Sequence, residues 1–185
     1  MHSSISNYQI DDIGASGELT NLYGQQKDFP DQDYSVRDGR RTYSGNSVKC
    51  VWVKNGDASA ITRRLVLKWD SGTDEVGRVV VPAGDGDQPC GVANPYMLTA
   101  GAAAGEGFFM IVEGPGQLIS DGGSTLAVTD VVVTAASGKV NKQTAAPADT
   151  TAAMVQVNSR VGRPMESVTN VDGTTFRALI GPFPK

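Results

Sequence analysis

The sequence predicts an all-β fold, either a small antiparallel β-barrel or a sandwich, with an extended N-terminal arm. Short apolar runs of strand length recur between turn signals, at the spacing of about 8–12 residues that is typical of such folds. The 185 residues include 22 glycines and 9 prolines, which favour turns over long helices. The alanine-rich run LTAGAAAGE at 98–106 is interrupted by Gly101 and Gly105, so we expect a turn there instead of a helix.

The first 45 residues differ from the rest of the chain. They are polar and charged, show no periodicity, and carry isolated apolar residues. Because such a segment cannot build a core of its own, we expect an extended arm at 1–45 and a β-rich domain at 46–185. The arm is expected to dock on a partner through separate anchors, with a disordered tail as the alternative. The expected anchors are Tyr8, Ile10, Leu22, Tyr23, Phe29 and Tyr34.

From residue 48 the pattern changes to strands and turns. The run VKCVWVK at 48–54 alternates, which places Val48, Cys50 and Trp52 on one face of a strand. The Asn-Gly pair at 55–56 is a hairpin turn signal. The tract KQTAAPADTTAA at 142–153 predicts a loop. Further strands are expected at 61–69, 77–82, 90–93, 106–114, 117–120, 124–128, 130–135, 139–142, 154–165 and 175–181.

The sequence offers little for catalysis. The sole histidine is His2, beside the first residue, so a histidine-based triad or general base is excluded. Asp85 and Asp87 in PAGDGDQP, and the carboxylates of DSGTDE at 70–75, are expected to cap turns. A calcium site is the alternative reading of these carboxylates. No phosphate-binding loop is present, so we expect no enzyme, no catalytic residue, no metal and no cofactor.

Charge and cysteine content narrow the partners and the compartment. The net charge is −4 and the lysines and arginines are scattered, which argues against nucleic acid. No apolar run reaches membrane-span length, and the N-terminus lacks signal-peptide features. The protein is therefore expected to be made in a cytosol and not exported by a signal peptide. Cys50 and Cys90 are expected to be buried thiols, with a disulfide as the alternative.

A series of short motifs runs through the C-terminal half in a fixed order. The series is GVA at 91–93, AGE at 104–106, VEG at 112–114, TD at 129–130 before VVV, SGKV at 137–140 and VG at 161–162. Over roughly residues 89–180 this series resembles the capsid decoration, or cement, proteins of tailed bacteriophages. The resemblance implies a small β-barrel or β-tulip domain without catalysis. It also implies binding to the outside of an assembled capsid, often as trimers.

The expected function is that of a structural virion protein on the outer capsid surface. Its expected partners are the major capsid protein, which it would stabilise by bridging neighbouring subunits, and its own copies in a homotrimer. A first alternative is another phage structural β-protein, such as a head fibre base or a tail or head-completion component. A second is a carbohydrate-binding β-module, which needs aromatic platforms. Trp52 and Trp69 lie in expected strands with apolar neighbours, so we expect them in the core.

Overall fold

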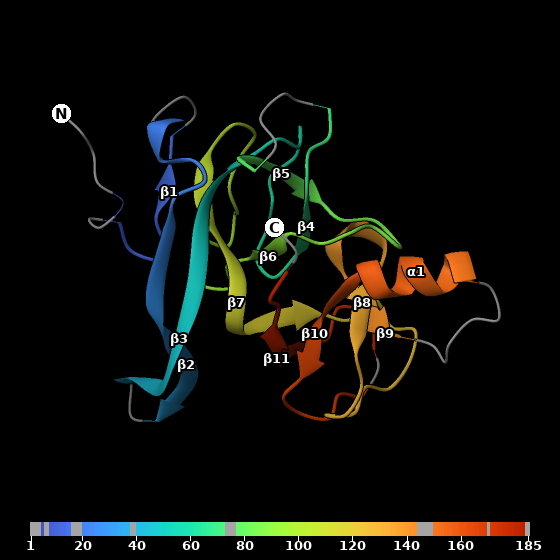
Figure 1. The fold of residues 1–185 in the computed structure, drawn as a ribbon. Coiled ribbons are helices and arrows are strands. Elements are labelled where there is room, and N and C mark those ends of the chain that lie inside the picture. The colour runs from blue at the N-terminus through green and yellow to red at the C-terminus, as the bar shows by residue number, and fades with distance from the viewer. Residues whose placement is uncertain are drawn as a thin grey trace.

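The described part of the chain contains eleven strands, one α-helix and two short 3-10 helices at Thr20–Leu22 and Ala136–Gly138 (Figure 1). The computed structural model describes residues 5, 8–15, 20–37, 40–72, 77–143, 150–169 and 171–183. The all-β class predicted from the sequence is confirmed. The elements are β1 Ile13–Gly14, β2 Gln26–Arg37, β3 Arg40–Asn55, β4 Val66–Trp69, β5 Val79–Pro82, β6 Gly91–Ala93, β7 Gly107–Ile119, β8 Val132–Thr134, β9 Val140–Lys142, α1 Thr150–Asn158, β10 Arg160–Pro164 and β11 Thr175–Ile180.

Five of the strands pair in a closed ring. The order is β3, β5, β4, β6 and β7, and β7 pairs back onto β3. The β3–β5 pair is parallel and the other ring pairs are antiparallel. Val53, Leu67, Val80, Phe108 and Met110 are buried together in one apolar cluster. Because side chains alternate along a strand, these positions share one side of the ring.

The second part of the sheet grows from the end of β7. The first half of β7 pairs with β3 and β6, and the second half pairs with β11, which is followed by β10, β8 and β9. Figure 1 shows β7 running beside β3 and then turning toward β10 and β11. The turn lies at Gly114, whose φ is +110°. A Cβ atom there would lie 2.7 Å from the carbonyl oxygen of Ser47, so the corner requires glycine.

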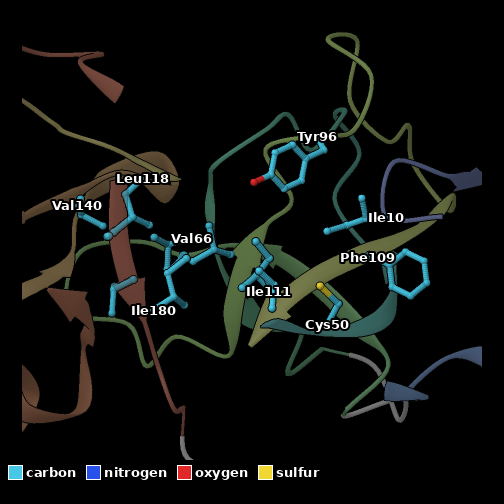
Figure 2. Close-up of a cluster of buried hydrophobic side chains, with 14 of the residues drawn as sticks. Ile10, Cys50, Val66, Tyr96, Phe109, Ile111, Leu118, Val140 and Ile180 are labelled. Atoms are coloured by element: carbon cyan, nitrogen blue, oxygen red, sulfur yellow. The ribbon is translucent and has the colours of Figure 1, made fainter. Parts of the chain in front are cut away.

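The larger apolar cluster joins both parts of the sheet. Figure 2 shows the cluster running from Leu118 and Ile180 at one end, past Ile111 and Cys50, to Phe109 at the other end. Cys50 lies on β3, and Phe109 and Ile111 lie on the first half of β7. Leu118 lies on the second half of β7, and Ile180 lies on β11. The two parts therefore share one core, and β3 is buried on both faces. This confirms the alternation predicted for residues 48–54.

The N-terminal segment is placed differently from the expected arm. Strand β2 pairs along β3, and the expected boundary at residue 46 falls inside β3. Leu22 is fully buried, and Phe29 packs edge-to-face on Phe109 with 4.8 Å between ring centroids. The ring centroid of Tyr8 lies 5.4 Å from that of Trp52. Widely spaced apolar residues thus fill separate gaps over β3 and β7, an arrangement that leaves no periodic trace in the sequence.

Several predicted elements also differ in the structure. The runs at 106–114 and 117–120 form the single strand β7, and the run at 124–128 contributes only a bridge between Leu126 and Val168. Residues 150–158 form helix α1, where a loop and the start of a strand were expected. The alternation of Val155 and Val157 indicated a strand, but the preceding Ala-Ala-Met run has high helix propensity. The predicted turn at 98–106 is confirmed by hydrogen bonds from Gly101 N–H to Leu98 O and from Glu106 N–H to Ala103 O.

Candidate interaction surface

Helix α1 presents apolar side chains to solvent. Its nine residues, TTAAMVQVN, include no acidic or basic residue. Met154, Val155 and Val157 are 65%, 44% and 52% exposed, and they make up three of the eight exposed large hydrophobic side chains in the described part of the chain. A surface helix normally turns its apolar residues toward the core and its charged residues toward water. The composition and exposure of α1 are therefore those of a contact surface.

A pocket of about 340 Å³ lies beside α1. Its walls come from α1, from strands β8 and β9, and from the turns around residues 85 and 121. Figure 1 shows α1 beside the β8–β9 pair. These segments are far apart in the sequence, and pairing of β8 with both β9 and β10 brings them together. The lining includes Asp85, Asp121, Val133, Lys142, Val155 and Gln156.

Local hydrogen bonds hold the polar wall in place. One oxygen of the Asp121 carboxylate accepts the Gly123 N–H at 3.0 Å, and the other accepts the Asn141 side-chain amide at 3.4 Å. On the opposite side, Thr134 Oγ1 donates to the carbonyl oxygen of Asp87 at 2.9 Å. The same turn is closed by the Gly84 N–H, which donates to the Asp87 carboxylate at 2.6 Å. The two acidic turns are thus positioned by their own backbone, as predicted for Asp87.

The pocket is negatively charged. Its one cation, Lys142, pairs with Asp130 at 3.0 Å. The Ala127 N–H and Lys142 both hydrogen-bond to the Asp130 carboxyl and lower its pKa. Asp85 and Asp121 have no ion-pair partner among the described residues. Their carboxylates therefore set the sign of the electrostatic potential in the pocket.

The anchors predicted from the sequence lie elsewhere. Ile10, Leu22, Tyr23 and Phe29 are buried in the larger apolar cluster, and Tyr8 packs against it half-buried. Tyr34 lies on β2, but its side chain is outside the described part of the structure. The structure thus gathers five of the six residues in the core of this chain. Their contact with another subunit stays a prediction.

The side chains considered for chemistry have structural positions. Cys50 and Cys90 are buried free thiols, and burial raises the pKa of each thiol above its usual value. Trp52 is fully buried and Trp69 is half-buried, so neither forms an exposed platform for a sugar. Asp70 accepts the Gly72 N–H at 2.9 Å and so caps its own turn. Residues 74 and 75 lie outside the described residues.

The described residues contain neither a cluster of metal-binding side chains nor a helix able to cross a membrane. No group of three or more His, Cys, Asp or Glu side chains in the described ranges is placed to hold a metal ion. Within the same ranges, no helix has the length and apolar character needed to cross a membrane. The exposed helix and its neighbouring pocket are thus the features from which a binding function can be argued. Sequence reasoning missed both, although the uncharged TTAAMVQVN run was a signal.

The fold of this chain is similar to that of a solved phage protein. No protein-family model matches the sequence, and no curated protein is similar to it. The fold is similar to a solved structure described as the head fiber gp8.5 N base in bacteriophage phi29, with a TM-score of 0.50. The match covers 72% of this chain and 96% of that chain at 16% sequence identity. At this identity the likeness shows a shared fold.

Proposed function

We propose that this protein is a structural component of a bacteriophage virion that binds the outer surface of the head. The observation that carries the proposal is the fold, which is shared with the head fiber base of bacteriophage phi29 over 96% of that chain. The motif series in the C-terminal half of the sequence supports the same assignment, because it resembles the capsid decoration proteins of tailed phages. Two independent comparisons, one of backbone and one of motifs, thus favour a phage structural protein.

The finer proposal is a cement role, in which each copy bridges neighbouring major capsid subunits. One interface of modest affinity is sufficient for this role, because many copies on one lattice act together through effective concentration. The uncharged, exposed face of α1 supports a protein partner. A second candidate function is the base of a head fibre, which is favoured by the structural relative. Association as a homotrimer belongs to both candidates as a proposal.

We infer further that the protein acts by binding and not by catalysis. A thiolate is the reactive form of cysteine, and burial of Cys50 and Cys90 disfavours that form. The carboxylates of Asp70 and Asp87 are engaged in closing turns. These observations support a role in which the value of the fold lies in its contacts.

Particles purified with and without this protein test the proposal. Mass spectrometry of washed particles should find the protein in the complete particles, and protease treatment of intact particles should remove it from the outside. A cement protein should be present in many copies, and its loss should lower the temperature at which heads release DNA. A fibre base should be present in fewer copies, and its loss should leave that temperature unchanged. Absence of the protein from washed particles would contradict both roles.

A further inference from the structure

We infer that the pocket beside α1 binds one lysine or arginine side chain presented by a partner protein. The inference deepens the proposed function by naming the chemistry of the contact, and it rests on that function only for the identity of the partner, a capsid subunit. The pocket itself is defined by Asp85, Asp121, Val133, Lys142 and Val155. Two properties of these walls, their charge and their mixture of apolar and polar groups, point to a long basic side chain.

The first property is charge. Asp85 and Asp121 line the pocket without an ion-pair partner among the described residues. Lys142 does not offset them, because its ammonium group is paired with Asp130 at 3.0 Å. A cation entering the pocket meets uncompensated carboxylates, whereas an anion would be repelled. Because Asp85 is exposed and Asp121 is half-buried, added salt weakens this attraction but preserves its sign.

The second property is the mixture of apolar and polar walls. Val133 and Val155 contribute apolar surface from β8 and α1, and Ala135 and Ala136 add to it. Lysine and arginine bury an apolar stem while their charged head stays among polar groups. Thr134 and Asn141 supply further oxygen atoms along the same lining. A basic side chain therefore matches both the apolar and the polar walls, whereas a small metal ion would leave the apolar walls unused.

The first test is a titration of the full-length protein with n-butylguanidinium chloride, followed by the backbone amide signals in NMR. We expect saturable shifts in the millimolar range at amides of the lining segments, with smaller shifts at higher salt. The neutral probe 1-pentanol, of similar length, should bind at least about tenfold more weakly. Shifts that do not saturate, or equal binding of 1-pentanol, would overturn the inference.

A charge variant with a matched control makes the test specific. Asp85→Asn/Asp121→Asn removes both carboxylates and keeps an oxygen able to accept the Gly123 N–H. Asp57→Asn/Asp70→Asn removes the same charge from two other turns, where these side chains accept the N–H groups of Ser59 and Gly72. We expect the first variant to lose the guanidinium response by about tenfold or more. The second should keep the wild-type response, and equal behaviour of the two variants would overturn the inference.

Attachment to particles separates this inference from the proposed function. If both hold, Asp85→Asn/Asp121→Asn should weaken co-sedimentation with particles that lack the protein, and the control variant should not. If guanidinium binds as expected but the wild-type protein does not attach to particles, the proposed function fails and the pocket stands. If the wild-type protein forms an oligomer that the pocket variant dissociates, the occupant is a second copy. That result would contradict the capsid partner.

Discussion

Asp31 on β2 and Arg177 on β11 form an ion pair with 2.7 Å between Oδ2 and Nη2, although 146 residues separate them. The Asp31 side chain is 1% exposed, and its other oxygen lies 3.4 Å from the Tyr96 hydroxyl. This pair ties β2 to β11, the last strand of the fold. It therefore places β2 within the body of the protein.

Removing the partner of this buried carboxylate should destabilise the protein. Arg177→Met is expected to lower the free energy of unfolding by on the order of 3 kcal/mol, because the buried Asp31 side chain loses its paired cation. Urea denaturation measures the effect. Lys139→Met, which breaks the exposed pair with Asp172, is the control and should change stability little. Equal effects of the two variants would contradict the structural importance of the Asp31–Arg177 pair.

The N-terminal segment should be required for folding. Leu22 is fully buried, so Leu22→Ala should cost about 2–5 kcal/mol of unfolding free energy. Leu98, which is 65% exposed, provides the control, and Leu98→Ala should cost less than about 0.5 kcal/mol. Deletion of residues 1–40 removes β2 and should abolish the cooperative thermal transition. A truncated protein that melts like the full chain would restore the separate arm expected from the sequence.

The corner of β7 should tolerate no side chain. Gly114 and Gly173 both have positive φ, at +110° and +81°. A Cβ at Gly114 meets backbone 2.7 Å away, whereas nothing lies within 4 Å of a Cβ at Gly173. Gly173→Ala should therefore cost only the backbone strain of about 1–2 kcal/mol, and Gly114→Ala should cost clearly more. Thermal unfolding of both variants gives the comparison, and equal losses would mean that the corner can shift.

Acid should weaken the turn that borders the pocket. The hydrogen bond from Lys68 holds the pKa of the Asp87 carboxyl below its ordinary value of 3.8, with a further contribution from the Gly84 N–H. A lowered folded-state pKa means that this stabilisation is present above 3.8 and is lost as the pH falls through the folded-state pKa. In Asp87→Asn and in Lys68→Met, the free energy of unfolding should fall less steeply than in the wild type as the pH is lowered below 3.8. If both variants lose stability in acid as steeply as the wild type, the Lys68–Asp87 pair contributes nothing to the acid sensitivity.

The sequence predicted the fold class and the central strands well, for a physical reason. The alternation at 48–54 reflects β3, which is buried on both faces. Turns at Asp70 and Asp87 were predictable because an Asp side chain bonds to backbone close by in the chain. Such features depend on neighbours within a few residues.

Features that depend on distant residues were not predictable. Leu22 and Phe29 lack periodicity because each fills a gap formed by other strands. The pocket combines α1 with turns near residues 85 and 121, and no local pattern links these segments. Helix α1 was mistaken for a strand at Val155 and Val157 because two valines in alternation fit a strand as well as a helix.

Cryo-electron microscopy of purified particles is the measurement that tests the central claim most directly. The account predicts density on the outer surface of the head into which this fold fits, with α1 and its pocket facing a capsid subunit and a basic side chain entering between Asp85 and Asp121. Density at the tail or inside the head, or particles without this protein, would contradict the claim.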